Sequence, residues 1–305
     1  MAQNSLQLLN VGNVVTTAFQ LFKNRFKPYF LLAFKAYFWL LVPVYGWAKF
    51  FAISALISRL VYSELTNQPE TISGGEKYVN SKLWQFLVTS VLLAFIALSI
   101  WIVLLIVLAI IFTVIVLVFS GSISSLQPGE ITNTVISIIM VIISTIGSML
   151  LLIRFVISEL PLAIEDNINA TSTIRRSWKL TKDFGSNILL IYCVAFLITL
   201  PLLALSGSVY YLMFQDFTGS FLITYPLSAW ILLAVIVRRI FEFLLGGIIN
   251  KAQIINLLLI ILSLCLSIVV GAIQLPFWQT VKAVVYYDLR TQKEGLGLNL
   301  RDRNI

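Results

Sequence analysis

Residues 86–119 read FLVTSVLLAFIALSIWIVLLIVLAIIFTVIVLVF, a stretch that contains no Gly, no Pro and no charged side chain. As an α-helix rising about 1.5 Å per residue, this stretch would be about 50 Å long. The hydrocarbon layer of a bilayer is only about 30 Å thick. Strands of membrane barrels alternate apolar and polar side chains over about 10 residues, whereas this run is continuously apolar. The stretch therefore predicts a membrane-spanning helix that tilts or protrudes.

The rest of the chain has the same character. Of its 305 residues, 59% are hydrophobic and only 11% are charged, and the mean hydropathy is +0.97. Ordinary soluble domains are about one-quarter charged. No Lys, Arg, Asp or Glu occurs within residues 83–129, 131–153, 184–215, 217–237 or 252–281. We expect an all-α polytopic transmembrane bundle of about six spans, built as one membrane domain over residues 1–305.

Three segments read as amphipathic helices that lie on the membrane surface: 6–27, 169–184 and the stretch after Pro276. Their polar sides are basic, and basic side chains near an anionic leaflet contribute about 1 kcal/mol each. We therefore predict contacts with anionic lipid headgroups and not with nucleic acid, because these Lys and Arg residues adjoin spans and alternate with aromatic residues. The candidate headgroup contacts are Lys23, Arg25, Lys27, Arg175, Arg176, Lys179, Lys182, Lys282 and Arg290.

Two regions are ambiguous as spans. Residues 28–46 form a plausible span with one charge, Lys35, and a break at 43–46 precedes an apolar helix at 47–63, which is either a short span or a re-entrant segment. Residues 220–250 contain an Arg pair, and we expect them to be broken, re-entrant or interfacial. Residues 64–82 are expected to form a polar loop.

Lys and Arg near span ends predict orientation, because cytoplasmic loops are rich in them. The clusters at 23–27, 77–82, 175–182 and 282–303 are expected in the cytoplasm, and the loops 119–131 and 213–220, which lack Lys and Arg, outside. This pattern predicts a bacterial inner-membrane protein with both termini in the cytoplasm.

A weak internal repeat aligns Phe19-x-Leu21-x-Lys23 with Trp178-x-Leu180-x-Lys182, each ahead of a span. It indicates two pseudo-repeated halves, 1–165 and 166–305, although an amphipathic helix before a span is also a common pattern.

Three features carry a family resemblance: the aromatic and basic N-terminal helix, Glu165-Asp166 followed by IRRSWKL at 174–180, and YYDLRTQKEG at 286–295. With them the chain resembles the bacterial membrane proteins grouped with the membrane domain of glycerophosphoryl diester phosphodiesterases. The resemblance implies a membrane module of about six helices. The hydrolytic activity of that group resides in a separate soluble barrel that uses histidines and metal-binding carboxylates, and this chain has no histidine.

The absence of histidine removes the commonest general base, the Ser-His and Cys-His nucleophile pairs and the usual zinc sites. We therefore expect no enzymatic activity, no metal and no cofactor. Glu165 and Asp166 are adjacent, with Glu159 just before them. They are either a cation or proton site at the cytoplasmic mouth of a pathway, or structural residues that anchor the next helix by pairing with Arg175 or Arg176.

The charges inside apolar segments allow two interpretations as well. Lys35 either lines a pathway or extends to the interface. Arg238 and Arg239 precede Glu242 by four and three residues, a spacing that allows ion pairs on one helix face. They either bind a lipid phosphate or an anionic substrate, or neutralise one another.

Two function classes follow. The first is a non-enzymatic membrane module that scaffolds or partners other membrane components and binds anionic headgroups. The alternative is a transporter or lipid-handling permease whose pathway involves Lys35 and the broken helices.

Overall fold

A computed structural model describes residues 11–120, 130–213 and 251–295. Every regular element in these segments is helical, in agreement with the predicted all-α class. The shorter elements pack into a cluster that we call the hub: α1 (Val11–Asn24), α2 (Phe26–Trp39), α3 (Tyr45–Leu65), α4 (Ile72–Ser81), the 3-10 turn η1 (Ile153–Phe155), α7 (Glu159–Ile164) and α8 (Ala170–Thr181).

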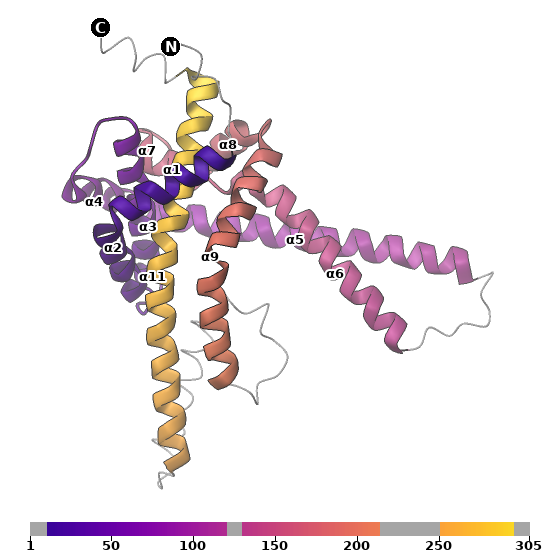
Figure 1. The fold of residues 1–305 in the computed structure, drawn as a ribbon. Coiled ribbons are helices and arrows are strands. Elements are labelled where there is room, and N and C mark those ends of the chain that lie inside the picture. The colour runs from indigo at the N-terminus through magenta and orange to yellow at the C-terminus, as the bar shows by residue number, and fades with distance from the viewer. Residues whose placement is uncertain (1–10, 121–129, 214–250, 296–305) are drawn as a thin grey trace.

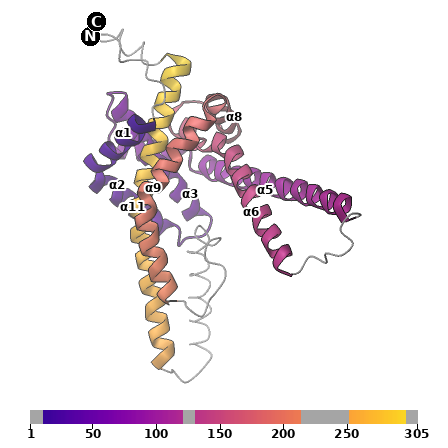
Figure 2. The ribbon, with the colours of Figure 1, turned by 45° about the vertical axis from the view of Figure 1, so that its right-hand side comes forward.

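Two pairs of long helices leave the hub (Figures 1 and 2). The α5–α6 arm consists of α5 (Leu83–Ser120) and α6 (Glu130–Leu152), and the α9–α11 arm of α9 (Gly185–Met213) and α11 (Lys251–Glu294). The arms point in different directions, and the C-terminal part of α11 is embedded in the hub.

Within the described residues, four helical stretches are long and apolar enough to cross a membrane: Leu83–Ile111, Ile138–Ile164, Gly185–Ala204 and Cys265–Glu294. The chain thus has the character of a multi-pass membrane protein. The expected count of about six is not confirmed, and the ambiguous segment 220–250 lies outside the described residues.

Helix α3 is the centre of the hub and packs against α2, α4, α5, α7 and α11. Ala48, Ala52 and Ala55 are fully buried, as are Leu56 and Ile57. Small side chains let neighbouring helices approach closely, while the larger ones fill the space between them. Because α3 is surrounded by other helices, it is a core element of the hub, and it is not among the described candidate spans.

The predicted break at 43–46 is confirmed, because α2 ends at Trp39 and α3 begins at Tyr45. Val44 has a φ of 59°, and a Cβ on Gly46 would lie 1.8 Å from the Trp39 carbonyl oxygen, so only glycine fits. The span expected over 28–46 is not formed as one helix: α2 has 14 residues, or about 21 Å, which is short of the hydrocarbon layer.

Two further boundaries differ from expectation. The polar loop predicted at 64–82 contains α4, whose first turn is capped by Thr71 Oγ1 accepting from the Gly74 N–H at 3.2 Å. The third surface helix predicted after Pro276 does not begin there, because α11 runs through Pro276 without a break. Around it, Phe277, Val281 and Val285 are buried among hub helices, and this packing compensates for the one backbone hydrogen bond that proline removes.

The other two predicted surface helices also pack one side against protein. Val14, Val15 and Ala18 of α1 are buried, and α1 packs against α9 and α11. Helix α8 buries Thr173, Ser177 and Thr181, whereas its Trp178 is exposed. Their placement on a membrane surface therefore remains a prediction for their exposed faces.

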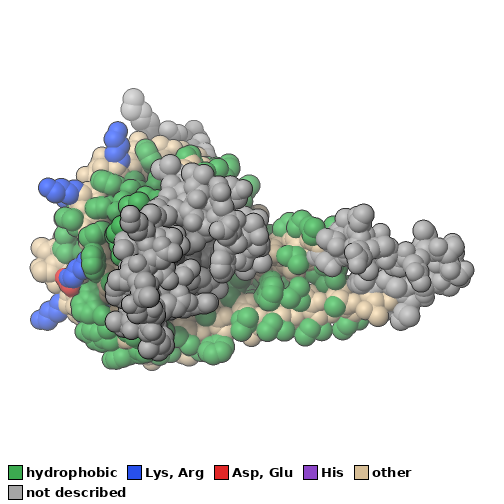
Figure 3. All heavy atoms as spheres, turned by 90° about the horizontal axis from the view of Figure 1, so that it is seen from below, with side chains coloured by type: hydrophobic (Ala, Val, Ile, Leu, Met, Phe, Trp, Pro, Cys, Tyr) green, Lys and Arg blue, Asp and Glu red, His purple; other side chains and the backbone are tan. Residues whose placement is uncertain are grey.

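The arms differ from the hub in the kind of side chain that they expose. In Figure 3, hydrophobic side chains follow the α5–α6 arm on the right, and Lys and Arg side chains lie at the left edge of the molecule. Cys193 of α9 and Cys265 of α11 are exposed free thiols.

Candidate functional site

The functional side chains gather where the arms meet the hub, and the segment between α7 and α8 positions them. Asn167 adopts a φ of 57°, which turns the chain sharply after α7. The Asn169 N–H then donates to Ser172 Oγ at 2.8 Å and fixes the start of α8. The turn places Glu165, at the end of α7, opposite Arg176 of α8.

Glu165 lies at the centre of a charged cluster. Its Oε1 accepts from Arg176 Nη2 at 3.1 Å and from the Tyr286 hydroxyl, and Arg290 Nε lies 3.8 Å away. Glu294 pairs with both Arg176 and Arg290, the latter at 2.9 Å. The two arginines and two glutamates neutralise each other, and they link α7, α8 and α11. We call these four residues and Tyr286 the Glu165 cluster.

Electrostatics in the Glu165 cluster follow from partial burial. Burial acts to lower the pKa of Arg176, but Glu165 and Glu294 outweigh it and raise the pKa above its usual value. Tyr62 of α3 accepts from Arg290 Nη1 at 3.1 Å, and burial raises its pKa against the opposing Arg290 charge. The arginines therefore remain charged and Tyr62 neutral at physiological pH.

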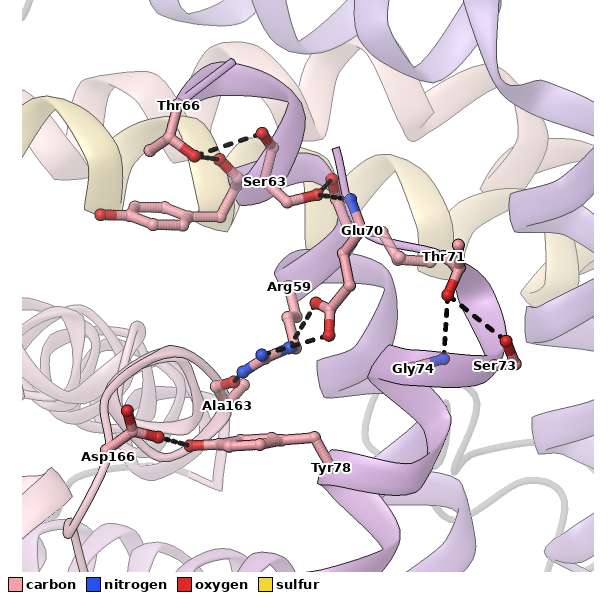
Figure 4. Close-up of polar contacts among 12 residues, drawn as sticks. Arg59, Ser63, Thr66, Glu70, Thr71, Ser73, Gly74, Tyr78, Ala163 and Asp166 are labelled. Carbon is pink, nitrogen blue, oxygen red and sulfur yellow. Dashed lines mark hydrogen bonds and ion pairs between the residues drawn. The ribbon is translucent and has the colours of Figure 1, made fainter. Parts of the chain in front are cut away.

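A second charged group surrounds Tyr78 of α4 (Figure 4). Arg59 Nε donates to Glu70 Oε2 at 2.6 Å, and its guanidinium lies 3.8 Å from the centroid of the Tyr78 ring. The Tyr78 hydroxyl donates to the Glu165 carbonyl at 2.9 Å and lies 3.3 Å from Asp166 Oδ1. Lys82 Nζ donates to the same hydroxyl at 2.6 Å. These contacts fasten α3 and α4 to α7.

Four more ion pairs join separate elements of the hub. The pairs are Arg25–Glu64 at 3.0 Å, Lys35–Glu76 at 2.7 Å, Lys282–Glu159 at 2.6 Å and Lys293–Asp183 at 2.8 Å. The hydrogen bond from Lys293, and then its charge, lowers the pKa of the exposed Asp183 carboxyl. These carboxylates are occupied in holding helices together.

The structure divides the nine predicted headgroup contacts into two groups. Arg25, Arg176, Lys282 and Arg290 pair with carboxylates of the hub. The other five are exposed and form no ion pair with any described residue: Lys23, Lys27, Arg175, Lys179 and Lys182. We call these five the free bases. Arg175 and Arg176 are neighbours in sequence, yet only Arg175 is free.

The predicted pathway residues have different outcomes. Glu165 pairs with Arg176, as the structural interpretation expected, while Asp166 contacts Tyr78. Lys35 pairs with Glu76 of α4, a partner that sequence reasoning missed. Arg238, Arg239 and Glu242 lie outside the described residues.

Sequence reasoning also missed Glu294, Tyr286 and the residues around Tyr78. Only the i,i+4 spacing of Arg290 and Glu294 could have indicated a pair in advance. Across the described segments, no group of three or more His, Cys, Asp or Glu side chains could hold a metal ion.

No protein-family model matches the chain, and comparisons with curated proteins and with solved structures found no match. Function is therefore inferred from the geometry of the hub and its free bases.

Proposed function

We propose that the chain is a non-enzymatic integral module of the bacterial inner membrane that scaffolds or partners other membrane components and binds anionic lipid headgroups. The division of the basic residues supports this proposal. One set is neutralised by hub carboxylates and holds helices together, and the free bases leave positive charge on exposed surfaces.

The position of the free bases fits a membrane surface. They lie on α8 and around the α1–α2 junction, and α1 and α8 share the end of the molecule where α11 ends (Figure 1). Phe26 and Trp178 are exposed next to them, and aromatic rings beside basic side chains are typical of the headgroup region. The positive-inside rule assigns this end, and both termini, to the cytoplasm.

The non-enzymatic part of the proposal has separate support. The chain contains no histidine, and Glu70, Glu159, Glu165 and Glu294 are engaged in ion pairs. A catalytic carboxylate has to be available to a substrate and have a pKa suited to proton transfer. Paired carboxylates that join helices serve stability instead.

Lipid retention tests the proposal. The full chain is purified from vesicles of mixed anionic and zwitterionic phospholipid, and the lipids that remain bound are quantified by mass spectrometry. The triple variant Arg175→Ala/Lys179→Ala/Lys182→Ala should lose anionic lipid, on the order of a fivefold loss of affinity per base, from about 1 kcal/mol each.

The control is Arg176→Ala, which removes one basic side chain of the same helix that pairs with Glu165 and Glu294. It should destabilise the hub but leave the preference for anionic lipid in the folded fraction. Equal retention by the triple variant and the unmodified chain would refute headgroup binding by α8.

The transporter alternative is tested with the same vesicles. The proposal predicts no solute flux. A flux that Lys35→Ala abolishes would replace the scaffold proposal with the permease alternative.

A further inference from the structure

The turn between α2 and α3 presents an exposed apolar tip. Leu41, Val42 and Val44 keep 46%, 43% and 51% of their surface exposed, although they adjoin the most deeply buried helix of the hub. We call residues 40–44 the tip. Apolar side chains gathered at a turn are unfavourable in water, so their environment requires explanation.

Most of the backbone N–H groups of the tip are paired. The N–H groups of Leu40, Leu41 and Val42 donate to the carbonyls of Tyr37, Phe38 and Trp39 at 3.0–3.2 Å, and Pro43 has no N–H. Tyr45 donates back to the Pro43 carbonyl at 2.7 Å. Paired backbone groups cost less free energy in hydrocarbon than unpaired ones, so these bonds lower the cost of placing the tip there.

A ring of interfacial side chains surrounds the base of the tip. Lys49 Nζ lies 5.9 Å from the Trp39 ring centroid and 5.8 Å from that of Tyr45, and it donates to Asn80 Oδ1 at 2.9 Å. The rings of Tyr45 and Trp84 are 6.5 Å apart. Trp and Tyr concentrate at the boundary between hydrocarbon and headgroups, and Lys extends its charge toward water there. The ring therefore marks a boundary between polar and apolar surroundings.

Helix α11 independently indicates the same depth for the boundary between polar and apolar surroundings. Tyr37 of α2 lies against Gly271, where an added Cβ would be 2.4 Å from Tyr37 Cζ. The candidate span Cys265–Glu294 is buried in the hub from Phe277 onward, so we place the crossing of α11 N-terminal to that part. From Gly271 back to Lys251, α11 has enough residues to cover about 30 Å, the thickness of the hydrocarbon layer. Leu258 and Leu262 on this stretch are exposed. The tip thus lies just inside the hub end of the part of α11 that is long enough to cross.

We propose that the tip enters the acyl-chain region of the leaflet on the hub side as a re-entrant loop that does not cross. Helix α2 is too short to cross, and both ends of the α2–α3 hairpin return to the hub. The tip then anchors the hub at a fixed depth, a role beyond headgroup binding by α8. The inference depends on the crossing of α11 and is tested separately from it.

Fluorescence quenching by brominated acyl chains tests contact with lipid. In a Cys193→Ala/Cys265→Ala background, single cysteines at Val42→Cys, Leu262→Cys and Lys77→Cys carry a bimane label in reconstituted vesicles. Leu262 reports on the crossing part of α11, and Lys77, exposed on α4, is the control outside lipid.

The expected result is that the labels at 42 and 262 lose most of their emission in brominated lipid while the label at 77 keeps it. Quenching at 262 without quenching at 42 would overturn the inference, because water, a partner or a second copy would then cover the tip. Loss of quenching at 262 would instead refute the crossing of α11. Stronger quenching at 42 by bromines near the headgroup than by bromines at the chain end is expected, and the reverse would exclude a shallow loop.

Discussion

The hub and the α5–α6 arm are built from the same chain by different physical means. In the hub, buried apolar side chains and ion pairs such as Lys282–Glu159 and Lys35–Glu76 join elements that are far apart in sequence. In the arm, residues 83–129 contain no charge, and none of the most hydrophobic window of α5 is buried. The hub is therefore stabilised by its own contacts, whereas the arm depends on lipid for its surroundings.

The contacts inside the arm illustrate the difference. Helix α6 buries Ser144 and Ser148, and a Cβ on Gly147 would lie 3.4 Å from Leu104 of α5. Small residues let two helices approach where lipid offers no hydrophobic driving force. Helices that cross one bilayer are tilted by about 0–40° from its normal, so we expect a bilayer to bring the two arms closer to parallel.

The largest expected effect is a difference in stability between truncating a buried side chain of the hub and truncating an exposed side chain of the arm. Ile57→Ala removes a fully buried side chain of α3 and should lower the free energy of unfolding by about 2–5 kcal/mol, because a cavity remains. Val103→Ala on the exposed face of α5 should change it by less than about 0.5 kcal/mol in detergent. Denaturation of both variants in the same detergent gives the comparison, and equal losses would contradict it.

A somewhat smaller effect is expected from the Glu165 cluster. Glu165→Ala leaves Arg176 and Arg290 with Glu294 alone and the Tyr286 hydroxyl without its acceptor, and should cost about 1–3 kcal/mol. Asp166→Ala removes the adjacent, exposed carboxylate and should cost less than about 1 kcal/mol. Thermal unfolding in detergent measures both, and a larger loss for Asp166→Ala would show that the cluster is misassigned.

Glycine substitutions test the close approach at the turn between α2 and α3. Gly46→Ala forces a Cβ into the Trp39 carbonyl and should destabilise by about 1–3 kcal/mol. Gly185→Ala at the start of α9 meets no atom within 4 Å and should be neutral or stabilise by up to about 1 kcal/mol. Similar melting temperatures for the two variants would argue against the tight turn.

The smallest effect is a pH dependence at the edge of the hub. The pKa of Asp183 is lowered in the folded state, so its pair with Lys293 stabilises above the unfolded carboxyl pKa of about 3.9. This contribution is lost as pH falls through the lower folded pKa. The difference in melting temperature between the unmodified chain and Asp183→Asn should be constant from pH 7 to about 5 and then shrink. A difference that grows on acidification would reverse the assignment.

The sequence predicted the apolar helices well, because α5 and α6 follow directly from runs without charges. It failed where tertiary packing decided the outcome. Pro276 was expected to end a helix, but burial of its neighbours keeps α11 continuous. The basic residues of α8 were all predicted to contact headgroups, and only the position of Glu165 and Glu294 distinguishes the paired Arg176 from the free Arg175. Long-range partners such as Glu76 for Lys35 leave no local pattern.

The most direct test of the account is the membrane side on which α8 lies. In a Cys193→Ala/Cys265→Ala background, Arg175→Cys and Ser124→Cys, the latter in the loop expected outside, are exposed to a membrane-impermeant maleimide. The account predicts that intact spheroplasts label only Ser124→Cys and that inverted vesicles label only Arg175→Cys. Labelling of Arg175→Cys in intact spheroplasts, or of both sites from one side, would contradict a cytoplasmic hub with its free bases on the anionic leaflet.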